Sequence, residues 1–185
     1  MCGIFALLNS KYHSFTNIKE NFMKTQNRGP EYSEIIDIPS INTHLGFHRL
    51  AINGVNEKKS NQPFFIDGVY LVCNGEIYNH KGLIDILNIT PNSRSDCEVI
   101  IHLYKRYGMK QTLQMLDCVC AFVLIDTLNK KVYTGIAAEV EAGLGRPLKG
   151  YTDLRIIFAS TLVKPIRLGI ITFSLPRPLP TTKSI

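Results

Sequence analysis

The helix expected to begin near Ser95 is the segment that most constrains the fold of this chain. Ser95 and Glu98 have the Ser-x-x-Glu spacing of a capping box, in which two side chains bond to free backbone N–H groups of the first turn. Gly108 is a natural C-terminal stop. Between these ends, apolar residues recur at the spacing of one helix face: Val99, Ile100, Leu103, Tyr104 and Tyr107. The sequence therefore predicts a helix that buries one face, followed by a second short helix over Gln111–Leu116.

Strand-like segments lie on both sides of this helix in the sequence. Short apolar runs bounded by polar or turn-forming residues are typical of buried strands. They occur before the helix at Gly3–Asn9, Ile41–Ile52 and Tyr70–Cys73, and after it at Cys118–Asp126 and Lys131–Thr134. An earlier helix is expected after Thr16, which is a candidate cap. Strands, then helices, then strands again predict an α+β sandwich rather than a regular alternation of parallel strands and helices.

Charge and composition argue against several function classes. The net charge of +6 is spread over 185 residues without a basic stripe or an aromatic RNA-binding pattern, so no nucleic-acid partner is expected. The longest apolar runs are far shorter than the roughly 20 residues that span a bilayer, and no signal peptide is recognised, so no membrane partner is expected. An odd number of cysteines, five, without a secretory signal predicts a reducing, cytoplasmic environment.

Cys2 directly follows the initiator methionine and has two interpretations. It is either an incidental residue of an N-terminal strand or, after removal of Met1, a nucleophile that carries its own α-amino group. Such an amine has a pKa of roughly 7.7–8.0 and is suited to act as general base for the thiol of the same residue. The second interpretation requires further groups that stabilise an oxyanion and hold a small amino acid.

Candidates for these groups occur at three places. Asn74-Gly75-Glu76 follows an apolar strand, where the backbone is expected to turn, and the Asn74 amide and the Gly75 N–H are suitable oxyanion donors. Arg49 has a planar guanidinium suited to a carboxylate, whereas Asp96 and Glu76 suit an ammonium group. The alternatives are that Arg49 is a surface ion-pair partner and that Asp96 is an acid of the first helical turn, favoured there by the helix dipole.

Taken together, these segments resemble the class II glutamine amidotransferases and, within them, the glutaminase half of the asparagine synthetases. The start, Met1-Cys2-Gly3-Ile4-Phe5, is similar to the processed start of that family. Further family motifs follow in order: Arg28-Gly29-Pro30, Phe47-His48-Arg49-Leu50-Ala51-Ile52, Gln62-Pro63, Asn74-Gly75-Glu76-Ile77-Tyr78-Asn79-His80, Ser95-Asp96-Cys97-Glu98-Val99-Ile100 and the stretch from Gln111 to Tyr133. The resemblance covers residues 1 to about 134, nearly three quarters of the chain.

The resemblance implies a fold and a reaction. The implied fold is the four-layer αββα sandwich of the N-terminal-nucleophile hydrolases. Cys2 would be the nucleophile with its own α-amine as base, and Asn74 and Gly75 would form the oxyanion hole. The implied reaction hydrolyses the side-chain amide of L-glutamine through a γ-glutamyl thioester, giving glutamate and ammonia for asparagine biosynthesis. This half-reaction is expected to need no metal and no other cofactor.

Substrate-binding residues are implied as well. Arg49 would bind the α-carboxylate of glutamine, and Asp96 and Glu76 would hold its ammonium group. Backbone contacts would come from the segment that follows Arg49: Leu50, Ala51, Ile52 and Asn53. Asn74 and Gly75 would touch the reacting amide.

The sequence departs from the family pattern after Thr134-Gly135. Residues 136–142 replace the usual Arg-Asp continuation, and Gly145-Arg146-Pro147-Leu148 comes later than the family pattern places it. We therefore expect one amidotransferase domain over residues 1–165, atypical after 135. Residues 166–185 are expected to be a proline-rich, basic tail that is extended and disordered.

An ATP-binding synthetase domain, which follows the glutaminase in asparagine synthetases, is not recognised in these 185 residues: its Ser-Gly-Gly-x-Asp-Ser loop does not occur. ATP and magnesium would belong to that missing domain. Two possibilities follow. The chain is a glutaminase that works with a synthetase domain or subunit, or it is a truncated, inactive module of the same fold with a binding or regulatory role.

Two other clusters of titratable residues are better explained by structure than by chemistry. Cys118 and Cys120 alternate in a predicted strand and point to one face, but they lack the further ligands at suitable spacing that zinc requires. We expect them to pack in the core. His44 and His48 alternate around another predicted strand, where polar contacts at a sheet are the commoner role.

Overall fold

The computed structural model describes residues 2–51, 57–137 and 171–174. The alternation of side chains along its first strand shows how the layers form. In β1 (Gly3–Leu7), Ile4 and Ala6 belong to one buried cluster, whereas Phe5 and Leu7 belong to another. Successive side chains of a strand point to opposite faces. Both faces of this strand are therefore covered, and the predicted buried strand is confirmed.

The first sheet has three antiparallel strands in the order β1-β3-β2. The central strand β3 (Thr43–Arg49) lies within the predicted strand at Ile41–Ile52, and every residue of β3 is buried. Its partner β2 (Tyr32–Ile38) was not expected from the sequence, because it alternates polar and apolar residues only weakly. The register places Gly3 opposite His48 and Tyr32 opposite Arg49. Arg49 thus ends the middle strand beside the start of β1.

The second sheet has five antiparallel strands in the order β4-β5-β6-β7-β8. These strands are β4 (Phe64–Ile66), β5 (Val69–Ile77), β6 (Cys118–Asp126), β7 (Lys131–Ala137) and β8 (Ile171–Ser174). The predicted strand at Cys118–Asp126 and its hairpin partner are confirmed, and β5 extends further than the predicted segment. Its last residues, Asn74 to Ile77, stay paired with β6.

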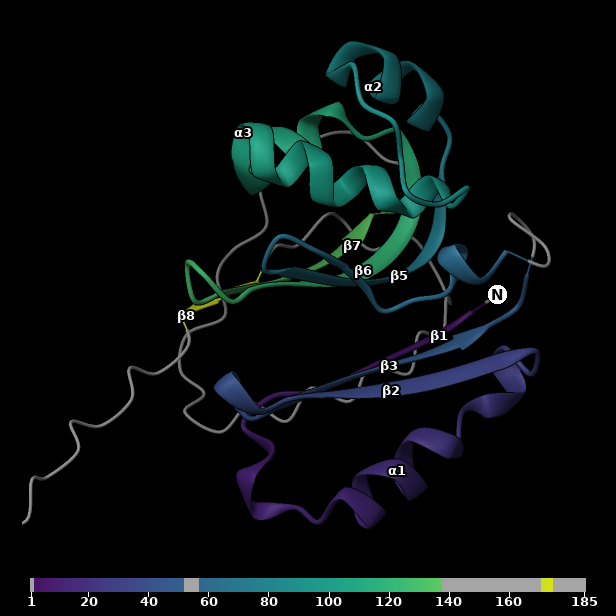
Figure 1. Ribbon diagram of the computed structural model, residues 1–185, viewed down its shortest axis with the longest axis vertical. Helices are drawn as coiled ribbons and strands as arrows, with labels where there is room; N and C mark the ends of the chain where they lie inside the picture. The colour runs from purple at the N-terminus through teal and green to yellow at the C-terminus, as the bar shows by residue number, and fades with distance from the viewer. Residues whose placement is uncertain (1, 52–56, 138–170, 175–185) are drawn as a thin grey trace, which may run out of the picture.

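Helices cover the outer faces of the two stacked sheets, so the chain forms four layers (Figure 1). Helices α2 (His80–Leu87) and α3 (Val99–Met115) pack on the five-stranded sheet, and α1 (Phe15–Met23) packs on the three-stranded sheet. Apolar residues of both sheets fill the space between them, among them Phe47 from β3 and Val72 from β5. The α+β class is confirmed. Helix α2 was not predicted, although Leu83, Ile84 and Leu87 recur at helical spacing and pack in the core.

The helix ends differ in detail from the sequence expectations. Ser14, not Thr16, caps α1 by accepting a hydrogen bond from Asn17 N–H. The predicted capping box at the start of α3 is wrong in its bonding. A short 3-10 turn, Asp96–Glu98, precedes α3, and the Ser95 hydroxyl accepts from Cys97 N–H. The Glu98 carboxylate turns away to the preceding loop.

Gly108, at φ 74°, interrupts α3 as predicted. Within the described ranges, further 3-10 turns lie at Ser10–Tyr12, Gln26–Arg28, Pro39–Ile41 and Lys58–Ser60.

The C-terminal segments are described only in part. Within the tail expected to be disordered, residues 171–174 instead form β8, which pairs antiparallel with β7. The physical reason is that β7 would otherwise be the edge of the sheet, with unpaired backbone groups that a short alternating segment can join. The remainder of the tail, the altered segment from residue 138 and the domain boundary at 165 lie outside the described residues. No helix in the described ranges is long and apolar enough to cross a membrane.

Candidate active site

A cavity of about 250 Å³ lies where the ends of β1, β3 and β5 approach the start of α3. This volume is below the roughly 300–1,000 Å³ typical of sites for drug-sized ligands, and it suits a ligand of amino-acid size. The sequence-predicted residues that line it are Cys2, Arg49, Leu50, Asn74, Gly75, Glu76 and Asp96. Residues from four separate segments of the chain are therefore brought together, as the sequence motifs predicted.

Cys2 lies half-buried at the start of β1. Its Sγ accepts a hydrogen bond from Leu50 N–H at 3.4 Å and lies 3.5 Å from Leu50 O. Arg28 Nε donates to Cys2 O at 3.3 Å, which anchors the backbone of this residue. Burial raises the pKa of the Cys2 thiol, while the Leu50 hydrogen bond and the charge of Arg49 lower it in part. The thiol is thus held in place but needs a base to become a thiolate at neutral pH.

Arg49 is buried, which rules out the surface position considered in the sequence analysis. Its side chain is only 7% exposed, and one Nη donates to Asn61 Oδ1 at 2.6 Å and to Glu57 O at 3.3 Å. Arg49 lines the cavity, and it also lines an adjacent depression, which Asn61 and Glu57 border. A buried guanidinium at the cavity is suited to bind a carboxylate in bidentate geometry.

Asn74, Gly75 and Glu76 line the cavity from within β5, not from a turn after it. The expectation of a turn is therefore wrong, because β6 continues alongside: Gly75 pairs with Cys120 and Glu76 with Val119. A Cβ on Gly75 would lie 2.2 Å from Val119 O. Glycine is therefore required here by the close approach of β6. Asn74 is buried, whereas Gly75 and Glu76 are exposed on the cavity side.

Asp96 lies opposite these residues at the start of the 3-10 turn before α3. It is 6% exposed, and its Oδ2 accepts a hydrogen bond from Ile77 N–H at 2.7 Å. The carboxylate thus connects the helix start to the end of β5. With Glu76 it gives the cavity two carboxylates, and Arg49 supplies a cation. This charge arrangement is complementary to a zwitterionic amino acid.

The segment after Arg49 is described only in part. Leu50 lines the cavity, and its backbone contact with a substrate carboxylate stays a prediction. Ala51 instead borders an adjacent depression, where its N–H donates to the Glu31 carboxylate. Ile52 and Asn53 lie outside the described residues, so their backbone contacts stay predictions.

Gln62 is a cavity residue for which the sequence analysis gave no role. Its buried side-chain amide bonds to both backbone groups of Cys73: Nε2 donates to Cys73 O at 3.0 Å, and Oε1 accepts from Cys73 N–H at 2.6 Å. The amide therefore acts as one more rung of the β4–β5 ladder, immediately before Asn74. The Gln62-Pro63 motif was a signal for this position, but the contact spans 11 residues and cannot be read from local periodicity.

We expect Gln62→Met to lower the free energy of unfolding by about 1–3 kcal/mol, measured by urea denaturation. Methionine keeps the volume but leaves the buried N–H and C=O of Cys73 without these partners. Gln111, exposed on α3, provides a matched control, and Gln111→Met should change the free energy of unfolding by less than about 0.5 kcal/mol. Equal changes in the free energy of unfolding for the two variants would contradict a stabilising role of the Gln62 hydrogen bonds to β5.

The remaining titratable clusters behave as structural groups. Cys118 and Cys120 are buried in the core beside the helices, with their Sγ atoms 3.6 Å apart. No group of three or more potential ligands suited to a metal occurs among the described residues. His48 is stacked on Phe22, its Nε2–H donates to Phe22 O at 3.0 Å, and its Nδ1 lies 2.7 Å from the Ser33 hydroxyl oxygen. Burial lowers the pKa of His48. The predicted core packing of the two thiols and the predicted polar contacts of His48 at a sheet are confirmed.

Comparison with known proteins gives one family and a set of closely similar sequences. The family of glutamine amidotransferase domains matches residues 1–162. Glutamine-hydrolysing asparagine synthetases of Bos taurus and Homo sapiens are each 40% identical over 139 residues, which is 73% of this chain and 24% of theirs. That of Gallus gallus is 39% identical over 137 residues, 72% of this chain and 24% of its own. The chain thus spans about a quarter of the length of these relatives.

Proposed function

Because the chain belongs to the family of glutamine amidotransferase domains, we propose that it hydrolyses the side-chain amide of glutamine to glutamate and ammonia. The observation that carries this proposal is the position of Cys2 Sγ in one cavity with Arg49, Asn74-Gly75 and Asp96. A nucleophile, oxyanion donors and charges for both ends of an amino acid are then close together. We propose that the four layers are those of an N-terminal-nucleophile hydrolase.

Substrate binding in this proposal uses both charges of glutamine. The guanidinium of Arg49 binds the α-carboxylate, and the carboxylates of Asp96 and Glu76 hold the ammonium group. Backbone groups from Leu50 to Asn53 complete the contact with the carboxylate end. The side-chain amide of the substrate then points toward Cys2 and Asn74.

The chemistry begins with the thiol of Cys2. After Met1 is removed, the α-amine of Cys2 takes the thiol proton, and the sulfur attacks the amide carbon. The Asn74 amide and the Gly75 N–H stabilise the oxyanion, each with an effect on the order of 10²–10³ in rate. Ammonia leaves with the proton returned by the amine, and a γ-glutamyl thioester forms. Water, activated by the same amine, then hydrolyses the thioester to glutamate.

The ammonia acceptor belongs to another part of the system in this proposal. By likeness to the glutamine-hydrolysing asparagine synthetases, residues 1–165 supply ammonia to a synthetase domain or subunit for asparagine biosynthesis. ATP and magnesium act there, and the glutaminase reaction itself needs no cofactor. All five cysteines are free thiols, which supports a reducing, cytoplasmic location.

The test is release of ammonia and glutamate from glutamine by the purified chain, followed in a coupled assay. Intact-mass measurement first establishes that Met1 has been removed, because a blocked Cys2 has no free α-amine. The proposal expects equal amounts of both products. Binding of glutamine without ammonia release, with the methionine confirmed absent, would contradict it.

A further inference from the structure

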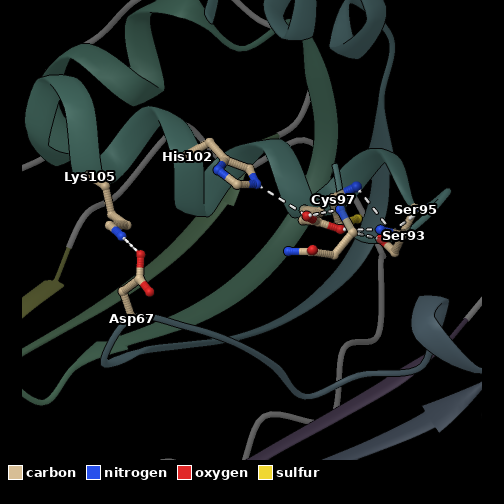
Figure 2. A network of polar contacts seen from close by, with 8 residues as sticks. Asp67, Ser93, Ser95, Cys97, His102 and Lys105 are labelled. Atoms are coloured by element: carbon tan, nitrogen blue, oxygen red, sulfur yellow. Dashed lines mark hydrogen bonds and ion pairs between the residues drawn. The ribbon is translucent and has the colours of Figure 1, made fainter. Parts of the chain in front are cut away.

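The carboxylate of Glu98 is one of the most buried charged groups in the described part of the protein, although it touches neither the cavity nor solvent. Its side chain is about 1% exposed. Figure 2 shows a network of polar contacts at this end of α3, with Ser93, Ser95, Cys97 and His102 among its labelled members. A buried charge is costly unless hydrogen bonds surround it. Its partners therefore indicate what it holds in place.

Those partners come from the loop immediately before Asp96. Glu98 Oε1 accepts from Asn92 N–H at 2.8 Å, and Oε2 accepts from Ser93 N–H at 2.8 Å and from the Ser93 hydroxyl at 2.5 Å. The Ser93 hydroxyl in turn accepts from Ser95 N–H at 3.2 Å. Asn92, Ser93 and, through the Ser93 hydroxyl, Ser95 are thus tied to Glu98, whereas the N–H of Arg94 between them donates to the Glu57 carboxylate at 3.0 Å.

A fourth contact comes from α3, where His102 Nε2 lies 3.1 Å from Glu98 Oε1. Burial raises the pKa of the Glu98 carboxyl, but the hydrogen bonds from His102, Ser93 and Asn92 outweigh burial and lower its pKa overall. Glu98 is therefore ionised at neutral pH and only accepts hydrogen bonds. Each of its two oxygens faces a backbone N–H, so a side chain with one donor end does not fit.

We propose that Glu98 is a positioning residue for the ammonium end of the substrate site and acts through Asp96. The loop that Glu98 fixes ends at Ser95, which lines the cavity beside Asp96. Asp96 Oδ2 is bound to Ile77 N–H, so the orientation of its carboxylate depends on where the loop places its backbone. This inference rests on the proposed binding of glutamine in the cavity. It assigns to Glu98 a role that the capping-box interpretation missed.

The test measures ligand binding in a Cys2→Ala background by titration calorimetry, so that no turnover occurs. Two ligands are compared: L-glutamine and 4-carbamoylbutanoate, which has the same amide and carboxylate but lacks the ammonium group. The substitution is Glu98→Gln. In either orientation, its amide NH₂ faces a backbone N–H, of Asn92 or of Ser93, and repels it.

We expect Glu98→Gln to weaken glutamine binding by about tenfold and to leave binding of 4-carbamoylbutanoate within about twofold. The matched control is Asp67→Asn, which removes another carboxylate that contacts α3. Asp67 pairs with Lys105 at an exposed position, as Figure 2 also shows. Asparagine tolerates the positive φ of this residue, 45°, so the control should bind both ligands like the parent.

Two results for folded Glu98→Gln would overturn the inference. One is unchanged affinity for glutamine, and the other is equal weakening of the binding of both ligands, which a merely structural role predicts.

If Glu98→Gln does not fold, Ser93→Ala decides, because it removes only the hydroxyl that links Glu98 to Ser95. That variant should weaken glutamine selectively by about threefold, and parent-like binding of glutamine would overturn the inference. A parent that binds no glutamine overturns it together with the proposed function. If the variants bind both ligands as expected but the unmodified chain releases no ammonia, the proposed function is contradicted and the role of Glu98 in binding is not.

Discussion

Replacement of Cys2 by alanine should reduce ammonia release from glutamine by a factor on the order of 10⁴ or more. Cys2, Cys73 and Cys97 all line the cavity, but Cys73 and Cys97 are buried, whereas Cys2 is half-buried and its Sγ accepts a hydrogen bond from Leu50 N–H. Without the sulfur no thioester can form, and the α-amine has no proton to take. The measurement is the initial rate of ammonia release at saturating glutamine, after intact-mass measurement confirms that Met1 has been removed.

Cys118→Ala provides the matched control for this loss. Cys118 is also a buried thiol, but it lies in the core beside α2 and α3 and does not line the cavity. Its alanine variant should release ammonia at a rate close to that of the unmodified chain. If Cys2→Ala retains a rate within tenfold of the unmodified chain while it is folded, then Cys2 is not the nucleophile.

Gly75→Ala should lower both stability and activity, and this is the second large effect we expect. The added Cβ would lie 2.2 Å from Val119 O and 2.4 Å from the Cys120 backbone, neither of which can move without separating β5 from β6. Overpacking of this kind costs about 1–3 kcal/mol. Displacement of the Gly75 N–H from the oxyanion should lower kcat by about 10²–10³. Thermal unfolding and steady-state kinetics measure the two effects.

Gly82→Ala separates a local clash from a general effect of replacing glycine. Gly82 lies in α2, and a Cβ there would meet nothing within 4 Å. Alanine favours a helix over glycine by about 1 kcal/mol, so this variant should be slightly more stable and equally active. A Gly75→Ala protein as stable and as active as the Gly82→Ala protein would contradict the close approach of β6 and the role of the Gly75 N–H.

The sequence predicted which residues line the cavity better than it predicted their burial and the secondary structure in which they lie. Cys2, Arg49 and Asp96 were singled out because their chemistry is specific and their motifs are ordered along the chain. Whether Arg49 lies at the surface or in the interior could not be decided, because its burial depends on the pairing of β3 with strands on both sides. Only the assembled sheet places Arg49 at the cavity.

Local patterns also led to two wrong expectations near the site. The Ser95-x-x-Glu98 spacing fits a capping box. The Glu98 carboxylate instead accepts three hydrogen bonds from Asn92 and Ser93 in the preceding loop. Likewise, Asn74-Gly75-Glu76 has the composition of a turn, yet pairing with β6 keeps it in a strand. In both cases tertiary contacts outweigh a local propensity, which a single sequence does not reveal.

The edge strand β2 and the side-chain hydrogen bonds between distant residues were the least predictable parts of the fold. The strand β2 alternates weakly and forms because β3 offers it a partner over seven residue pairs. The side chain of Gln62 completes a backbone ladder 11 residues away, which no periodicity encodes. By contrast, β1 and the β6–β7 hairpin follow directly from their apolar patterns, because both are covered on two faces.

The most direct test of the central chemical claim is detection of the γ-glutamyl thioester on Cys2. The chain is mixed with glutamine and quenched in acid during steady state, where a thioester is stable, and its peptides are then analysed by mass spectrometry. We predict a glutamyl group on the N-terminal peptide that begins with Cys2, lost on treatment with hydroxylamine and absent without glutamine. Ammonia release with the N-terminal peptide unmodified throughout, or with the glutamyl group on another cysteine, would contradict the mechanism.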